Sequence, residues 1–386
     1  MQPTVRMLGT RGVPAAHGGF ETAAENIGLE LVRRGWRVVV YCQDDAPGAS
    51  VRTDTWNGIE RVHVPSRYPG ANGTMWFDLV SVRHAAHHAA REGGVCLTFG
   101  YNTGMLNSIL KARGVPNVVN MDGLEWKRAR WTGSQRAFLY AQERAACRLG
   151  THLIADHPEI KKHLETRVRA SKITTIAYGA PSVYDAPQSV LVDHGLEPGG
   201  YLTLVARPVP ENSILEVVRG FSSRRWGHQL VVLGTYDRGD SYQGAVLDAA
   251  SDEVRFLGAI YDTEVVQALR FHSAGYVHGH QVGGTNPSLV EALGCGNPVI
   301  AHHNRYNRWV AQGAALYFSD ESGVVSALDR LLGDPRLAAR MSSYARERHT
   351  AEFTWPRIAD QYESLIRTYL RTPRARVERP LSIGHA

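Results

Sequence analysis

The sequence predicts an α/β protein with two doubly wound domains, each a mostly parallel sheet covered by helices. Short apolar runs alternate with helical periodicity from the first residues onward, and the same alternation starts again near residue 201. The length of 386 residues also exceeds one ordinary core, since domains rarely grow beyond about 250–300 residues. The loops at the carboxyl ends of two such sheets would face each other across a cleft, where these folds bind ligands.

The first domain is expected over residues 1–180. Strands over 4–8 and 36–42 are predicted to flank a helix over 20–34, because apolar residues recur there at helical spacing and Gly35 follows its end. A last strand over 173–177 leads into a Pro-containing segment to about Val192, which we interpret as the interdomain linker. Between these limits we predict strands at 61–64, 95–99, 118–121 and 153–155, and helices at about 76–91, 104–113 and 133–148.

The second domain is expected over residues 193–355. A basic tail, predicted to be mobile, follows at 373–386. The strands are predicted at 201–206, 229–233, 254–257, 275–278 and 298–301, and the helices from about 213 and 263 and over 324–332, 336–348 and 356–370.

Composition indicates a globular protein, with 43% hydrophobic and 21% charged residues. No apolar run approaches the roughly 18 residues that span a bilayer, and no signal-type region opens the chain, so we expect a cytoplasmic protein. The four cysteines lack zinc-site spacing and are expected to be reduced and mostly buried. No helix-turn-helix, zinc-finger or RNP-type pattern supports nucleic acid as a partner.

Basic and aromatic residues are interleaved over residues 126–148, which suits an anionic membrane surface. The alternative is the solvated face of a helix. The basic residues are Lys127, Arg128, Arg130, Arg136, Arg144 and Arg148, and the aromatic ones are Trp126, Trp131, Phe138 and Tyr140.

The most informative segment, residues 280–301, predicts a glycine-containing loop, a helix start and a buried strand in succession. Asn286 is a good N-cap and Pro287 suits the first helical position, so the N–H groups of Ser288 and Leu289 are expected to be free and to point outward. A helix N-terminus carries roughly half a positive charge, which favours a phosphate there without a metal. Glu291, one turn further on, would accept sugar hydroxyls. The alternative is an ordinary loop of a βα unit.

Two further segments place polar groups near predicted strand ends in the first domain. Gly18 and Gly19, preceded by His17, would let a ligand approach the backbone closely, although they also suit a plain tight turn. Neither GxGxxG nor GxxxxGK[ST] is present. Asp122 could orient a hydroxyl nucleophile or accept its proton, with Lys127 or Arg128 neutralising a diphosphate. Alternatively, Asp122 caps a turn and the basic residues are solvated.

Arg207 follows the strand expected at 201–206 and could clamp a leaving phosphate through its guanidinium. No Asp-x-Asp pair is present to hold a divalent ion against a diphosphate, so we expect metal independence and no cofactor. The alternative for Arg207 is an ordinary surface ion pair.

Taken together, five segments resemble the GT-B glycosyltransferases of family GT4, and more narrowly a bacterial rhamnosyltransferase-like branch, over nearly the whole chain. The resemblance implies retaining sugar transfer from a nucleotide donor bound mainly by the C-terminal domain to an acceptor held by the N-terminal one. It also implies that the final helix, about 356–372, crosses back onto the first domain. The segments are Gly9-Thr-Arg-Gly-Val-Pro-Ala-Ala-His-Gly-Gly-Phe-Glu-Thr, Asn120-Met-Asp-Gly-Leu-Glu-Trp-Lys-Arg, Ala206-Arg-Pro-Val-Pro-Glu-Asn, Gly283-Gly-Thr-Asn-Pro-Ser-Leu-Val-Glu-Ala and Phe353-Thr-Trp.

Three positions depart from the general GT4 pattern. Of the two glutamates usually eight positions apart, Glu291 matches the second, whereas Gly283 stands at the first, so a donor-sugar contact is missing. Asn212 replaces the basic residue five positions after the arginine, which leaves the diphosphate more dependent on Arg207. Asp122 stands where many relatives have histidine.

The predicted site therefore has three groups of residues. The predicted catalytic residues are Asp122, Arg207 and Glu291. The predicted acceptor-binding residues are His17, Glu125, Lys127 and Arg128. The predicted donor-binding residues are Gly18, Gly19, Arg207, Asn212, Gly284, Thr285, Asn286, Ser288, Leu289 and Glu291.

The resulting hypothesis is a glycosyltransferase that moves a sugar, with dTDP-rhamnose favoured as donor by resemblance alone. The acceptor would be a polyprenyl-diphosphate-linked or other saccharide, used in cell-surface polysaccharide assembly by an enzyme peripheral to the cytoplasmic membrane. Two alternatives are a GT-B sugar-nucleotide epimerase, which needs no acceptor, and a non-catalytic nucleotide-sugar-binding protein.

Overall fold

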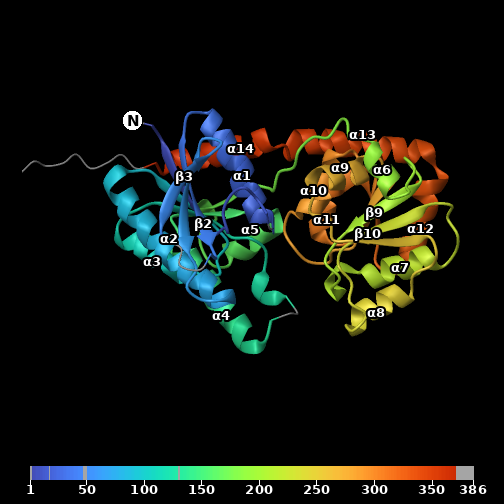
Figure 1. Cartoon of the computed structure of the whole chain (residues 1–386), viewed down its shortest axis with the longest axis horizontal. Helices are drawn as coiled ribbons and strands as arrows, with labels where there is room; N and C mark the ends of the chain where they lie inside the picture. Colours follow the sequence, from blue (N-terminus) through green and yellow to red (C-terminus); the bar gives the residue numbers. More distant parts are fainter. Residues whose placement is uncertain (1, 17, 47–49, 129–130, 371–386) are drawn as a thin grey trace, which may run out of the picture. The chain divides into compact units, whose positions relative to one another are not determined.

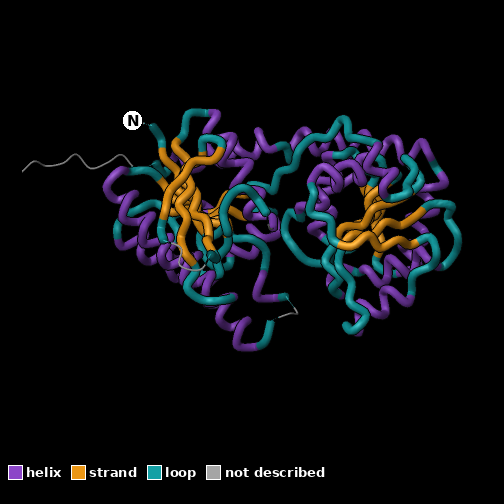
Figure 2. Tube along the Cα trace, viewed as in Figure 1, coloured by secondary structure: helices purple, strands orange, loops and turns teal. Residues whose placement is uncertain are grey.

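The computed structural model describes residues 2–16, 18–46, 50–128 and 131–370. The chain divides into two compact units, each with its own sheet (Figures 1 and 2). Unit 1 comprises Met1–Ala155, Leu164–Thr174 and Ala359–Ala386, and unit 2 comprises Asp156–His163 and Thr175–Ile358. The expected α/β class is confirmed. The His17 and Arg130 predictions and the basic tail at 373–386 lie outside the described residues.

In its described residues, unit 1 has an eight-stranded sheet of order β3-β4-β2-β1-β5-β6-β7-β8. The edge strand β3 runs antiparallel to β4, whereas β1 pairs in parallel with both β2 and β5. All five residues of β1 are buried, as expected for a parallel strand covered on both faces. The strands are β1 Thr4–Leu8, β2 Arg37–Asp44, β3 Arg52–Trp56, β4 Ile59–Pro65, β5 Val95–Phe99, β6 Asn117–Asn120, β7 His152–Ala155 and β8 Ile173–Thr175.

Helices of unit 1 bury an apolar face each. Phe77, Val82 and Ala86 of α2 pack in one core with the strand residues Val39 and Val62. The helical segments are α1 Gly18–Arg33, α2 Gly70–Glu92, η1 Gly104–Leu106, α3 Asn107–Ala112, η2 Glu125–Lys127, α4 Gly133–Leu149 and η3 Ala170–Lys172, together with α14 Trp355–Thr368 from Ala359 on.

Unit 2 has a parallel sheet, six-stranded in the described residues, of order β11-β10-β9-β12-β13-β14. By order of appearance this is 3-2-1-4-5-6, the doubly wound arrangement whose order reverses between β9 and β12. Such a reversal leaves a crevice at the carboxyl ends of the two central strands. The strands are β9 Tyr201–Val205, β10 Gln229–Leu233, β11 Val254–Gly258, β12 Gly275–His278, β13 Val299–His302 and β14 Ala315–Phe318.

The central strands of unit 2 bury both of their faces. Val277 and Ile300 point into the core formed with α7 and α12, whereas Tyr276 and Val299 belong to the core formed with α10 and α11. This period of two is the pleat of a strand with helices on either side. The helical segments are α5 Pro158–Glu165, α6 Ser189–Asp193, η4 Pro210–Asn212, α7 Ile214–Ser222, α8 Ser241–Asp248, α9 Thr263–Phe271, α10 Pro287–Gly294, α11 Arg305–Ala311, η5 Gln312–Ala314, α12 Glu321–Gly333 and α13 Pro335–Glu352.

Several elements differ from those expected. The first helix begins at Gly18, so Gly18 and Gly19 belong to its first turn and not to the preceding loop. The Pro-containing segment before residue 192 leads into the short helix α6, where Leu191 is buried. Strand β3 was not predicted because it is a mostly exposed edge strand with a polar sequence. Helix α8 was not predicted because Val246 is its one buried residue.

The last helix is tied to the sheet of unit 1 by polar contacts. The amide Nδ2 of Asn120, at the end of β6, donates a hydrogen bond of 2.7 Å to the hydroxyl of Tyr362. Glu363, next along α14, accepts from Trp36 Nε1 at 2.8 Å and from Arg34 at 3.0 Å. Because Asn120 is buried, water cannot easily replace the tyrosine hydroxyl.

We expect Tyr362→Phe to destabilise unit 1 by about 1–3 kcal/mol, because it leaves the buried Asn120 amide without its tyrosine partner. Scanning calorimetry would measure the change, with Tyr261→Phe as the matched control because Tyr261 is 85% exposed. Equal unfolding temperatures for the two variants would show that the contact contributes nothing.

Candidate functional site

Two loops of unit 2 meet where the strand order reverses. The loop after β12 and the turn after β9 are joined by two hydrogen bonds, from Gln281 N to the Glu211 carbonyl at 2.9 Å and from Gln281 Nε2 to Ser213 Oγ at 2.8 Å. Gly279 permits this packing, since a Cβ at that position would lie 2.1 Å from the Asn212 carbonyl oxygen. The reversal point is therefore a tightly joined pair of loops.

A third loop, after β13, is attached to the same backbone. Asn304 Nδ2 and Asn307 Nδ2 each donate to the carbonyl of His280 at 2.9 Å. Asn304 also caps α11, because its Oδ1 accepts from Tyr306 N at 3.0 Å. The carboxyl ends of β9, β12 and β13 thus share one hydrogen-bonded framework.

Arg207 lies exposed on this framework, directly after β9. Its backbone carbonyl accepts from Asn212 Nδ2 at 2.8 Å and from Val209 N at 2.8 Å. Asn212 itself is 3% exposed, so its amide acts on the site through the turn that presents Arg207. A direct contact between Asn212 and a donor stays a prediction.

The start of α10 is capped as the sequence indicates, but its N–H groups are not free. Asn286 is the N-cap and Pro287 occupies the first turn. Ser288 N donates to Asn286 Oδ1 at 3.1 Å, and Leu289 N donates to the Asn286 carbonyl at 3.1 Å. The expectation of two outward N–H groups was wrong, because the short asparagine side chain and its own carbonyl use them.

The preceding glycine loop holds a carboxylate that the sequence analysis did not identify. Thr285 N donates to Asp156 Oδ2 at 2.9 Å, and the Thr285 hydroxyl bonds to the Asp156 carbonyl. A Cβ on Gly284 would lie 2.1 Å from Asp156 Oδ2, so only glycine fits beside this carboxylate. Loop 284–285 thus binds a carboxylate of its own chain. The one available signal was the place of Asp156 directly after a predicted strand.

The segment that supplies Asp156 is fixed to α11. The His157 ring packs against Trp309 at 4.7 Å and Tyr306 at 5.2 Å between ring centroids. Glu159 forms an ion pair with Arg305 at 3.1 Å. Burial lowers the pKa of His157 to about 4, so this ring is neutral near pH 7.

Glu291 is held by a buried arginine on a different helix. Arg270 Nη1 of α9 lies 2.7 Å from Glu291 Oε2, and the arginine side chain is 4% exposed against 31% for the glutamate. Burial opposes the charge on Arg270, but the attraction of Glu291 outweighs it and raises the pKa of Arg270. Glu291 therefore presents an oriented, partly exposed carboxylate. The sequence gives no signal for Arg270, because it lies on an ordinary amphipathic helix.

Two histidine rings stack on each other at the end of β12. The rings of His278 and His280 are 4.3 Å apart at 11°. Burial lowers the pKa of His278 well below its usual value, and the nearby His280 and Arg270 act in the same direction. His278 is therefore neutral and adds no charge to the site.

In unit 1, the predicted residues lie at the start of α1 and after the end of β6. Gly18 and Gly19 open α1, and Glu21 of the same turn accepts from Arg11 N at 2.8 Å. Asp122 follows β6 with a positive φ of 55°, and its N–H donates to Asn120 Oδ1 at 3.2 Å. Such a backbone is uncommon outside glycine and tends to occur at functional sites. Asp122 is half-buried.

The residues after Asp122 form a packed turn. Glu125 is buried, with Arg128 Nε at 2.6 Å from Oε2 and Trp131 Nε1 donating to Oε1 at 3.0 Å. Lys127 is exposed and lies 5.3 Å from the centre of the Trp126 ring. Glu125 and Arg128 thus stabilise each other, and their acceptor-binding roles stay predictions. In the described part of the chain, no group of three His, Cys, Asp or Glu side chains has a metal-binding arrangement.

Comparison with known families gives one match for each half of the chain. Residues 2–181 match a domain of unknown function, DUF1972, and residues 214–364 match the family described as glycosyl transferase-like. A comparison with the sequences of curated proteins gave no match.

Solved structures agree on the fold. Sucrose-phosphate synthase from Thermosynechococcus elongatus is 19% identical over 95% of this chain and 99% of that chain, with a TM-score of 0.80. HepE of Anabaena, solved with UDP and glucose, is 14% identical over 95% and 100%, with a TM-score of 0.74. An α,α-trehalose-phosphate synthase (UDP-forming) from Burkholderia xenovorans, solved with glucose-6-phosphate, is 12% identical over 95% and 99%, with a TM-score of 0.69.

The fold is therefore that of the GT-B glycosyltransferases, as the sequence predicts. Residues 214–364 of this GT-B fold are in addition similar to the glycosyl transferase-like family.

We expect Gly284→Ala to destabilise unit 2 by about 1–3 kcal/mol, because the added methyl group collides with the Asp156 carboxylate. Asp156→Ala removes the colliding group, so the double variant should be more stable than the sum of the single effects predicts, by about 0.5–3 kcal/mol. Thermal unfolding of all four proteins measures this coupling, and additive effects would place the collision elsewhere.

Proposed function

We propose that this chain is a retaining glycosyltransferase whose unit 2 binds a nucleotide diphosphate sugar. The observation that carries the proposal is the framework at the reversal of strand order, where Gln281, just before the glycine loop 283–285, is hydrogen-bonded to the turn that presents the exposed Arg207. A crevice of this kind is where doubly wound sheets bind ligands. The glycosyl transferase-like match covers the glycine loop 283–285.

The donor is proposed to be bound through its diphosphate and its ribose. Arg207 would pair with the leaving diphosphate. One N–H of the 283–285 loop, that of Thr285, donates to the Asp156 carboxylate, so a donor phosphate would have to compete with that carboxylate there. Glu291, oriented by Arg270, would accept hydrogen bonds from ribose hydroxyls.

The donor sugar is proposed to be rhamnose from dTDP-rhamnose, on the sequence resemblance alone. The structural relatives support a nucleotide diphosphate, since HepE was solved with UDP and the Burkholderia enzyme is described as UDP-forming. Because residue 283 is glycine, this loop offers the sugar no carboxylate at that position. The space that a Cβ of residue 283 would enter is open.

For the chemical step we propose a same-face substitution without a metal or other cofactor. The nucleotide diphosphate would leave with its charge neutralised by Arg207, while the acceptor hydroxyl attacks from the side the diphosphate vacates. Asp122 of unit 1 would orient that hydroxyl and accept its proton. The positive φ of Asp122 supports this role, because strained backbone tends to be retained where function requires it.

The acceptor is proposed to be a polyprenyl-diphosphate-linked sugar, used by a cytoplasmic enzyme on an anionic membrane surface. Support comes from the exposed side chains of Lys127, Arg136 and Arg148, and from the exposed Phe138 and Tyr140. Basic groups beside aromatic rings suit the headgroup region of a bilayer. None of the helices in the described ranges is long and apolar enough to cross a membrane.

Arg207→Ala should lower kcat/KM tenfold or more, because a charge-assisted hydrogen bond of about 1.5–3 kcal/mol to the leaving group is lost. Arg225→Ala is the matched control, since Arg225 is an exposed arginine of the same unit that precedes β10 and pairs with Asp252. If Arg207→Ala stayed within a factor of three of the control while remaining folded, its role at the leaving group would be refuted.

A screen of dTDP-, UDP- and GDP-sugars by thermal shift tests the donor class. A cognate donor at about 100 times its Kd should stabilise the protein by roughly 2.7 kcal/mol. Transfer to a lipid-linked saccharide should follow with the same donor and persist in EDTA. Conversion of the donor to an isomer without acceptor would indicate an epimerase, and binding without turnover a non-catalytic protein. Loss of activity in EDTA, restored by magnesium, would contradict the metal-free step.

A further inference from the structure

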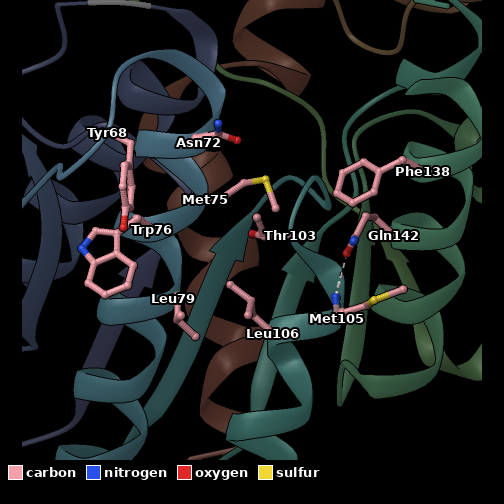
Figure 3. Close-up of a pocket in the computed structure, with 10 residues that line it drawn as sticks. All are labelled: Tyr68, Asn72, Met75, Trp76, Leu79, Thr103, Met105, Leu106, Phe138 and Gln142. Atoms are coloured by element: carbon pink, nitrogen blue, oxygen red, sulfur yellow. Dashed lines mark hydrogen bonds between the residues drawn. The ribbon is translucent and has the colours of Figure 1, made fainter. Parts of the chain in front are cut away.

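An apolar groove lies in unit 1, and residues that follow β5 form part of it. Its volume is about 550 Å³, and side chains from the start of α2, from η1 and from α4 form its walls (Figure 3). Tyr68 and Trp76 line one side, and Phe138 and Gln142 line the opposite side. The ten lining residues are Tyr68, Asn72, Met75, Trp76, Leu79, Thr103, Met105, Leu106, Phe138 and Gln142.

The apolar lining is exposed to an unusual degree. Four of the lining residues are large apolar side chains with 42–53% of their surface exposed: Tyr68, Met75, Met105 and Phe138. Among the described residues of unit 1, the other large apolar side chains with comparable exposure are Val51 and Tyr140. A concentration of this kind marks an interaction site, since large exposed apolar side chains are usually scattered singly.

The exposed charged residues on the segments that line the groove are basic. On the lining segments 66–79, 101–106 and 133–142, the exposed charged residues are Arg67 and Arg136. Asp78 is the one acid in these segments, and it is buried, accepting a hydrogen bond from Thr103 at 2.8 Å. Arg67 lies over the Trp76 ring at 5.0 Å, so its charge is held at the rim. An occupant of the groove would therefore combine an apolar body with an anionic end.

The volume of the groove favours one lipid chain over the surface of another protein as its occupant. A volume of about 550 Å³ falls within the roughly 300–1,000 Å³ of small-molecule sites. A stable protein interface instead needs about 800 Å² on each partner, spread over some twenty residues. Met75 and Met105 have flexible thioether side chains that adapt to an irregular apolar ligand.

We propose that this groove binds the isoprenoid chain of a lipid phosphate, with the phosphate beside Arg67 and Arg136. The inference deepens the proposed function, on which it rests, by assigning the lipid part of the acceptor to named residues. In this proposal the isoprenoid chain leaves the bilayer and enters the protein. Adsorption of the protein to a membrane surface alone is a different outcome.

The test is a calorimetric titration of the full chain with farnesyl phosphate, geranyl phosphate and inorganic phosphate. We expect farnesyl phosphate to bind at least tenfold more tightly than geranyl phosphate, because one more isoprene unit is buried, and inorganic phosphate to bind most weakly. Met75→Asp and Phe138→Asp should each weaken farnesyl phosphate binding at least tenfold. Val192→Asp is the matched control, because Val192 is an exposed apolar residue on α6 of unit 2.

Both groove variants change exposed side chains, so their unfolding temperatures and donor binding should equal those of the unaltered protein. Unchanged farnesyl phosphate affinity in both variants would overturn the proposal. So would affinities independent of chain length, or binding to phosphatidylglycerol vesicles without binding of farnesyl phosphate.

The proposed function is judged by a separate measurement. If chain-dependent binding is lost in the variants but no donor sugar is ever transferred, the groove assignment stands and the transferase proposal fails. If sugar is transferred equally well to lipid-linked and chain-free acceptors, and Met75→Asp has no effect on either, the transferase proposal stands and the groove assignment fails.

Discussion

The parallel pairing of β9 with β12 is the constraint on which the site of unit 2 depends. Chain connections leave these two strands toward opposite faces of the sheet, so their carboxyl ends are not covered by a crossing helix. Gly279 then lets the two loops approach to backbone contact, and His280 offers its carbonyl to the asparagines after β13. Arg207 and the glycine loop are held on a scaffold whose positions follow from strand order.

Sequence reasoning succeeded where the signal is local. The parallel strands are continuous apolar runs, and the Asn-Pro pair marks the start of α10. It failed where a partner is distant in sequence: Arg270 orients Glu291 from another helix, and Asp156 reaches Thr285 across 129 positions. Nothing in the composition around either residue indicates these contacts. The N–H groups of Ser288 and Leu289 were misjudged for another reason. The N-cap residue Asn286 accepts hydrogen bonds from both groups, so neither is left free.

The basic and aromatic stretch at 126–148 separates into two parts with different physical roles. Trp126 donates to the buried Glu143, which also pairs with Arg167, so this part belongs to the interior of unit 1. Arg136 and Phe138 on α4 are instead exposed, and Phe138 borders the apolar groove. The two roles belong to different elements, since Trp126 lies on η2, whereas the basic and aromatic residues of α4 are exposed or half-buried.

Asn120 connects helix α14 with the turn at Asp122. Its Nδ2 bonds to Tyr362, and its Oδ1 accepts from the N–H of Asp122. During synthesis on the ribosome, every strand among the described residues is made before residue 362. N-terminal parts of a chain generally fold first. The amide of Asn120 therefore has no tyrosine partner until residue 362 has been made, and shorter chains lack one of the two bonds that hold Asn120 beside Asp122.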